Sequence, residues 1–202
     1  GEWASVSRWK WKNKPKPHLE YYMPAIIKDV DDVNAGMDII DEALDKANVK
    51  DKHFIQGNHE LWLDHFVESA PYLPQFACKE AIKIDERGYT YHRAGELLTI
   101  GDMSFYHGHN YGGMHHAAAH AKNFKCNIMY GHHHDIQVYS EKSKDGLIMA
   151  YSIGCLKSLE REKNEFIGGR PINWAHAIAV VDFIGNSHFV KVIRIVNGKY
   201  SL

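Results

Sequence analysis

No stretch of the sequence approaches the ~18 consecutive apolar residues that a membrane-spanning helix requires, and its first residues lack the charged and then apolar pattern of a secretory signal. Charge of one sign is not in excess, since 24 lysines and arginines stand against 25 aspartates and glutamates. Internal repeats and low-complexity tracts are also lacking. We therefore expect a globular protein without membrane contact, and 202 residues suffice for one domain with a real core.

Cysteine is scarce. The three residues Cys78, Cys126 and Cys155 are odd in number and far apart, so they do not form the framework of a disulfide-stabilised secreted domain. They are typical of buried thiols in a reducing compartment, and we expect the cytoplasm.

Histidine is in excess. The sequence holds 15, and eight fall between positions 107 and 134: His107, His109, His115, His116, His120, His132, His133 and His134. A core does not need imidazoles at this density, whereas metal binding and acid–base chemistry near neutral pH both use them. The cluster therefore indicates one of these two kinds of chemistry.

Apolar periodicity predicts a mixture of helices and strands. Between residues 23 and 47 apolar positions recur at steps of three and four, which predicts one helix, or two broken near Gly36. Further helices are predicted at 60–67 and in HHAAAHAKNF. Short strands are predicted in KHFIQ, YTYHRAG, LLTIGD, MSFYHG, CNIMYG, IQVYS, LIMAYSIG, AHAIAVVDFI and HFVKVIRIV. The pattern favours an α/β (α+β-like) fold with a main body at 25–202.

The first 24 residues differ from the rest. SRWKWKNKPKPH alternates basic and aromatic residues and then carries two prolines, which favours an extended or looped arm. Cations that contact phosphates, together with indoles that stack on bases, are the combination used for single-stranded nucleic acid. Residues 8–16 are therefore a candidate nucleic-acid contact, and the alternative is a solvated arm whose tryptophans pack on the domain.

Three predicted strands end in the same way, with glycine beside ligand-type residues. The segments are 55–59 (IQGNH), 105–109 (FYHGH) and 129–134 (MYGHHH). Ligands of open α/β sheets bind beyond the carboxyl ends of strands, and glycine lets the backbone turn there. His132 and His134 are two residues apart, so both side chains can face one side. Together these strand ends predict a metal site.

The set GNHE, then HG, then GHHH resembles the calcineurin-like metallophosphoesterases. A closer likeness, through WASVSRW, GHNYGG, IGCL and a late Asn-Trp, is to a bacterial and bacteriophage branch. The resemblance implies a β-sandwich flanked by helices. It also exposes a gap, because the family's first two strands end in Asp-x-His and Gly-Asp-x-x-Asp, and no predicted strand before Gly57 ends in either motif. We therefore expect a single domain over 1–202 that is N-terminally incomplete and lacks the first two strands.

The resemblance assigns roles to residues of all three motifs. Asn58, His107, His132 and His134 would ligate divalent metal ions. His59 would protonate the leaving oxygen, Glu60 would orient His59, and His109 would contact the phosphate or support His107. The family's reaction is hydrolysis of phosphomonoesters or phosphodiesters by a metal-bound hydroxide, with two metals ~3.5–4 Å apart.

The missing carboxylates change the expectation for this chain. Neutral imidazoles and one amide hold a second dication poorly, so we expect one metal per chain, manganese, iron, zinc or nickel, and weak or absent activity. The alternatives are a non-catalytic metal- or nucleic-acid-binding remnant, or half of a split enzyme that another chain completes. Loss of two strands would leave a raw sheet edge, which predicts a homo-oligomer or a complementing partner.

Two other groups of residues have metal-ligand chemistry, and each also has an interpretation without a bound metal. His116 and His120 are four apart on the predicted 115–124 helix, which is metal-ligand spacing, but the glutamate of a zinc protease is missing and one of these histidines could instead lie at the rim of the site. Asp29, Asp31 and Asp32 could replace the missing carboxylates, and the favoured interpretation is that they are solvated charges on a helix.

Overall fold

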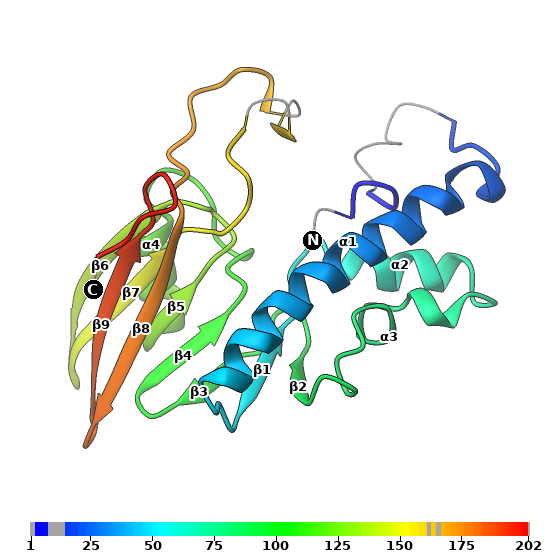
Figure 1. Cartoon of the computed structure of the whole chain (residues 1–202). Helices are drawn as coiled ribbons and strands as arrows, with labels where there is room; N and C mark the ends of the chain where they lie inside the picture. The colour runs from blue at the N-terminus through cyan, green and yellow to red at the C-terminus, as the bar shows by residue number, and fades with distance from the viewer. Residues whose placement is uncertain (1–2, 8–14, 161–162, 165–166, 202) are drawn as a thin grey trace. The chain divides into compact units, whose positions relative to one another are not determined.

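The computed structural model describes residues 3–7, 15–160, 163–164 and 167–201. It forms two compact units, unit 1 over Gly1–Ala94 and unit 2 over Gly95–Leu202, and each is considered by itself (Figure 1). The expected α/β class is confirmed, because a mixed sheet and helices make up the fold. The single domain over 1–202 stays a prediction.

Unit 1 is mainly helical with a small sheet. Its two strands run parallel and pair along their whole length. Its elements are α1 (Leu19–Lys46), β1 (Lys52–Ile55), α2 (Leu61–Ser69), the 3₁₀ helix η1 (Pro74–Phe76), α3 (Cys78–Ala81) and β2 (Tyr89–His92).

The long helix α1 begins earlier than the sequence predicts. It starts at Leu19 and continues through Pro24, so the prediction of a looped arm is wrong for residues 19–24. Pro24 lies in the second turn, where its missing N–H costs a single helical hydrogen bond. The helix is not broken at Gly36, where an added Cβ would meet no atom within 4 Å. The single-helix alternative is confirmed.

The described part of the N-terminal segment belongs to the core of unit 1. Trp3 is fully buried in one cluster with Ile26 of α1 and Leu63 of α2. Ser5 donates to Asp29 Oδ2 from its backbone N–H at 3.0 Å and from its hydroxyl at 2.5 Å. The prediction of a solvated charge is therefore wrong for Asp29, which ties this segment to α1. The rest of the basic arm, residues 8–14, lies outside the described residues.

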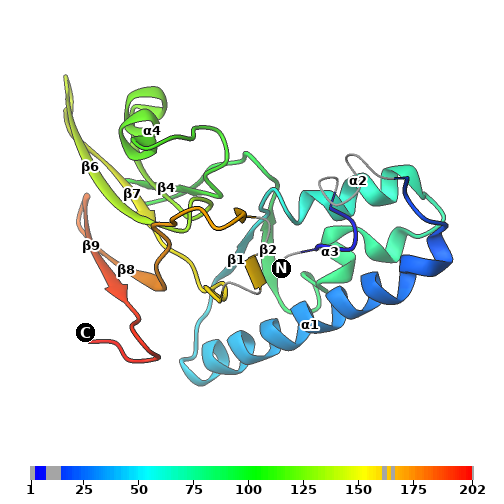
Figure 2. The same cartoon turned by 90° about the horizontal axis from the view of Figure 1, so that it is seen from above.

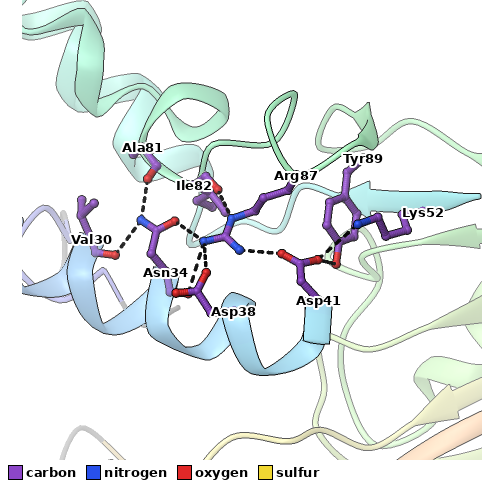
Figure 3. Close-up of polar contacts among 9 residues, drawn as sticks. All are labelled: Val30, Asn34, Asp38, Asp41, Lys52, Ala81, Ile82, Arg87 and Tyr89. Carbon is purple, nitrogen blue, oxygen red and sulfur yellow. Dashed lines mark hydrogen bonds and ion pairs between the residues drawn. The ribbon is translucent and has the colours of Figure 1, made fainter. Parts of the chain in front are cut away.

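A polar network joins α1 to the small sheet of unit 1 (Figure 3). The buried Arg87 guanidinium donates to Ile82 O at 3.0 Å, Asn34 Oδ1 at 3.0 Å and Asp41 Oδ2 at 2.5 Å. The Tyr89 hydroxyl donates to the other oxygen of Asp41 at 2.8 Å. Burial by itself would raise the pKa of Asp41, but the hydrogen bonds from Arg87 and Tyr89 outweigh it and hold that pKa below 3.8.

Unit 2 contains a five-stranded mixed sheet in the order β3-β4-β5-β7-β6, with a separate hairpin β8-β9. Strands β4, β5 and β7 are mutually parallel, and β3 and β6 are antiparallel edge strands. The elements are β3 (Leu98–Ile100), β4 (Met103–Tyr106), α4 (His116–Phe124), β5 (Asn127–Tyr130), β6 (Ile136–Ser143), β7 (Gly146–Ile153), β8 (Ala177–Ile184) and β9 (Ser187–Arg194).

The sheet of unit 2 is covered on both faces. Figure 2 shows α4 on one face and the hairpin β8-β9 on the other. Ala117 and Ala121 of α4 pack against Ile128 of β5, because small side chains let the helix approach the sheet closely. On the opposite face Met129 packs towards Val181 of β8. This arrangement of two sheets and a flanking helix agrees with the layers expected from the sequence.

The helices of the described ranges do not include one long and apolar enough to cross a membrane. The longest, α1, spans 28 residues and carries charges along most of its length.

Candidate functional site

The Gly57–Glu60 turn follows β1 directly and leads into α2. The backbone N–H of Leu61 donates to Gly57 O at 3.1 Å, which closes the turn. Glu60 accepts from the Gly57 N–H at 3.2 Å through one carboxylate oxygen and from the Trp3 indole at 3.1 Å through the other. These bonds hold the turn to the core of unit 1. The orientation of His59 by Glu60 stays a prediction.

Buried polar contacts hold the base of the same turn. Gln56 is almost fully buried; its amide donates to Asp64 of α2 at 2.6 Å and accepts from the Ala94 N–H at 3.1 Å. Asp64 also accepts from the Cys78 N–H at 2.8 Å. Strand β1, helix α2 and helix α3 are therefore fixed together immediately behind Asn58.

The side chains of Asn58 and His59 in this turn are both half-buried. The His59 ring stacks on the Trp62 indole with centroids 4.3 Å apart and planes 21° apart. Stacking on an aromatic ring restricts the imidazole to few orientations. This is a suitable arrangement for a group that must meet a substrate.

In unit 2, two of the histidine-bearing strand ends lie side by side. Strands β4 and β5 pair in parallel with Tyr106 opposite Tyr130, so His107 and Gly131 follow side by side at the carboxyl ends of the two strands. The Gly131 N–H donates to His107 O at 3.1 Å, which extends the pairing by one residue. The predicted convergence is therefore confirmed for these two segments.

Glycine is required at Gly108. Its φ is +112°, and an added Cβ would lie 2.7 Å from Cδ2 of Tyr130 and 3.1 Å from Cβ of His132. The chain can leave β4 at this point only because the side chain is missing. The close approach places the 107–109 segment against the 131–134 turn.

One contact at these strand ends joins two imidazoles. His107 Nε2 lies 3.0 Å from His132 Nδ1, with the ring planes 73° apart. Burial, and then the neighbouring histidines, lower the pKa of His132 to about 3. The ring is therefore neutral at physiological pH, which is the form that accepts hydrogen bonds and ligates metals.

This pair fits two positions of a metal site. Two imidazole nitrogens bound at ~2.1 Å and at right angles on one ion, as in octahedral or square-planar coordination, are about 3.0 Å apart, which is the separation observed between His107 and His132. Across the parts of the chain that the structure describes, however, His, Cys, Asp and Glu do not form a group of three that could hold a metal. Unit 2 thus brings two imidazole nitrogens together, and a metal site there stays a prediction.

His109 and His134 each follow a member of this pair by two residues. His134 has a left-handed backbone, φ +65°, and its ring meets the Trp174 indole edge-on at 4.5 Å. His109 is half-buried, with its ring centroid 5.8 Å from that of His107, and burial lowers its pKa. His109 therefore shares the cluster with His107 and His132, whereas His134 contacts the late Asn-Trp motif.

Sequence reasoning missed a buried network behind the triple histidine. His116 is 2% exposed; its Nε2 lies 3.0 Å from Asp135 Oδ1 and its Nδ1 lies 2.7 Å from the Tyr130 hydroxyl. Asp135 also accepts from Ser152 Oγ at 3.0 Å and Gln137 Nε2 at 2.8 Å. The available signal was Asp135 itself, a carboxylate directly after three histidines.

The network gives structural roles to histidines that could have been ligands. The His116 ring stacks on His133 at 3.8 Å, and His120 stacks on Tyr130 at 3.8 Å. His133 Nε2 lies 2.8 Å from Tyr111 O, so that ring donates to the loop after β4. His116 and His120 are therefore buried in the core of unit 2.

The predicted residues divide between the two units. Unit 1 holds Asn58, His59 and Glu60; unit 2 holds His107, His109, His132 and His134. Within unit 2 the structure brings His107, His109 and His132 together. A joint site with Asn58 and His59 stays a prediction.

Comparisons with known proteins do not assign a family to this chain. No family model matches the chain, and no curated protein does. Among solved structures, Vps29 from Entamoeba histolytica in complex with zinc has a TM-score of 0.37 and 15% identity over 61% of this chain and 73% of that one. A double mutant of that Vps29 gives 0.36 and 12% over 66% and 72%, and a single mutant 0.33 and 13% over 74% and 93%. Likenesses this weak carry no argument about metal or activity.

Proposed function

We propose that this chain is a metal-dependent phosphoesterase of the calcineurin-like type, from the bacterial and bacteriophage branch, that hydrolyses phosphomonoesters or phosphodiesters. The observation that carries the proposal is the approach of His107 Nε2 to within 3.0 Å of His132 Nδ1 at the carboxyl ends of two adjacent parallel strands. Neutral imidazoles at metal-ligand spacing are hard to explain by packing alone.

The ligands we assign are Asn58, His107, His132 and His134, with manganese, iron, zinc or nickel as the ion. A divalent ion bound there would polarise a phosphoryl oxygen and lower the barrier to attack by water. His107 and His132 are already at the required separation, so few side-chain rearrangements are needed.

His59 is the proposed proton donor to the leaving oxygen. Its ring is fixed by stacking on Trp62, and it sits at the end of a strand where a phosphate ester can be reached. His109 is proposed to contact the phosphate, since its ring lies beside His107 and is half-buried. Glu60 supports this side of the site by closing the Gly57–Glu60 turn.

A second candidate is half of a split enzyme, or a non-catalytic metal-binding remnant. It is favoured by the lack, in the ranges described, of any group of three His, Cys, Asp or Glu that could hold a metal. In this alternative a complementing chain or a second copy supplies the carboxylates. We also propose, for either candidate, nucleic acid as a contact of the 8–16 arm, in which Lys16 packs over the Tyr22 ring at 5.0 Å.

A reducing compartment, the cytoplasm, suits the described cysteines. Cys78, Cys126 and Cys155 are all unpaired thiols, and Cys78 is fully buried.

The test is manganese binding together with hydrolysis of bis(p-nitrophenyl) phosphate. We expect about one manganese ion per chain. Binding should be lost in His132→Asn, because this substitution removes one of the proposed imidazole ligands. Hydrolysis above the metal blank should be slow and should fall by about 10²-fold or more in His59→Asn, with metal binding retained. The matched control is His65→Asn, an exposed histidine on α2 that should leave both unchanged. Equal hydrolysis by the wild type and His59→Asn would contradict the role of that residue.

A further inference from the structure

A different pair of histidines lies on the sheet of unit 1. His53 is in β1 and His92 is the last residue of β2, and the parallel register places His53 opposite Thr90 and Ile55 opposite His92. Because alternate residues of a strand share a face, the two histidines are diagonal neighbours on one face.

That face is turned away from the core of unit 1. The residues of opposite parity, Phe54 and Tyr91, stack with centroids 6.2 Å apart and pack against the buried cluster of that unit. His53 is exposed and His92 is half-buried. The pair is therefore a surface feature, and core packing does not account for it.

The two rings face each other through their nitrogens. His53 Nδ1 lies 3.0 Å from His92 Nε2, with the ring centroids 5.2 Å apart and the planes 42° apart. This separation is again that of two imidazoles at right angles on one octahedral or square-planar ion, about 3.0 Å for bonds of ~2.1 Å. Both histidines stand on hydrogen-bonded strands, which hold their Cα positions fixed before any ion arrives.

We propose that His53 and His92 form a surface chelate for a late first-row divalent ion, copper, nickel or zinc. Imidazole nitrogens suit these ions and not magnesium or calcium, which prefer oxygen. The pair supplies two ligands only, since the described residues do not include a group of three possible ligands. Such a site takes an ion that still carries water or another chelator on its remaining positions.

Without metal, the two rings share one hydrogen bond. The ring that donates must move its proton to its other nitrogen, by exchange with solvent, so that both facing nitrogens present a lone pair. The number of bound protons is unchanged by this step. At acidic pH protons occupy both rings and compete with the ion, so binding should weaken on acidification.

The probe is copper(II) nitrilotriacetate, whose ligand leaves only neighbouring positions free on the ion, with tag-free protein and isothermal titration. We expect the wild-type protein to bind it at a site whose electron paramagnetic resonance spectrum shows two imidazole nitrogens. His53→Asn and His92→Gln place an amide near the lost ring nitrogen and so can keep a hydrogen bond between the strands. Each should weaken binding at this site by at least about tenfold.

Two control variants separate this site from others. His65→Asn removes an exposed histidine of unit 1 and should bind the probe like the wild type. His132→Asn removes the imidazole pair of unit 2 and should leave the two-imidazole signal of His53 and His92 in place. Circular dichroism shows whether His53→Asn and His92→Gln are folded. If one of them is unfolded, copper binding by the other one tests the proposal.

The proposal is overturned if the wild-type protein does not bind the probe, because the pair is then only a hydrogen bond. It is also overturned if His132→Asn abolishes binding while His53→Asn and His92→Gln do not. Manganese-dependent hydrolysis is not involved in either outcome, so failure here leaves the proposed function standing.

Discussion

Replacing Tyr130 with phenylalanine should destabilise unit 2 although the ring is kept. Asp135 is a carboxylate and can only accept from His116, so the neutral His116 ring carries its proton on Nε2 and accepts through Nδ1. The Tyr130 hydroxyl, 2.7 Å away, is the donor to that nitrogen. The substitution leaves Nδ1 of His116, a residue 2% exposed, without its donor.

The expected loss is about 1–3 kcal/mol, the cost of an unsatisfied buried polar group. Packing contributes little to it, because the phenylalanine ring can keep the stacking on His120 at 3.8 Å. Urea unfolding followed by circular dichroism measures the change, and in a chain of this size the melting temperature should fall by about 2–4 °C per kcal/mol. The matched control is Tyr139→Phe, which removes a hydroxyl that donates to Glu141 at the surface and should leave the free energy of unfolding nearly unchanged.

Equal stability of Tyr130→Phe and the wild type would refute this assignment of donors and acceptors. A double-mutant cycle with His116→Leu gives a second check. Once the imidazole is gone, losing the tyrosine hydroxyl should cost much less than it does alone. A cost that is the same in both backgrounds would show that the hydroxyl does not act through His116.

Three further predictions follow from single contacts. Gly108→Ala should lower the free energy of unfolding, measured in urea, by more than about 1 kcal/mol, because its φ is +112° and its Cβ would lie 2.7 Å from a tyrosine ring, whereas Gly112→Ala, with nothing within 4 Å, should not. The pKa of Asp41 is depressed, so the stability it contributes is complete above the pKa of the unfolded state, about 3.9, and is lost as pH falls through the pKa of the folded state. Urea unfolding at pH 7 and pH 3 should therefore show that Asp41→Asn loses less free energy of unfolding on acidification than the wild type does. Burial raises the pKa of Cys78 to about 12, so this thiol should not react with Ellman's reagent at pH 8 until the protein unfolds, and immediate labelling of Cys78 would contradict its burial.

The strand ends of unit 2 could be predicted from sequence because their signal is local. An apolar run that stops at glycine and continues with histidine marks the end of a strand, and His107 and His132 were found in this way. Their meeting required only that β4 and β5 be neighbours with the same direction, which short β–α–β segments impose. The 3.0 Å approach of the two nitrogens follows from that register.

Features that depend on distant partners could not be predicted. Helix α1 extends back over Pro24 because Tyr22 and Ile26 bury a face against residues 3–7, which outweighs the signal of the two prolines before it. Asp29 looked like one of three solvated charges, and only its contact with Ser5, 24 positions earlier, sets it apart. The helices η1 and α3 have three and four residues, too few for periodicity to show.

The buried network also explains why the carboxylate nearest to the histidine pair does not complete a metal site. Asp135 follows His134 directly, but its two oxygens accept from His116, Ser152 and Gln137, and all four side chains belong to unit 2. Its carboxylate oxygens are therefore used by these three side chains, and the contact with His116 fixes the tautomer of that buried imidazole. In the proposed metal site, His107 and His132 would then be neutral ligands, and a dication bound by them would keep its full charge. Such an ion would attract an anion strongly, so in the proposed reaction the phosphate of the substrate would itself supply negative charge.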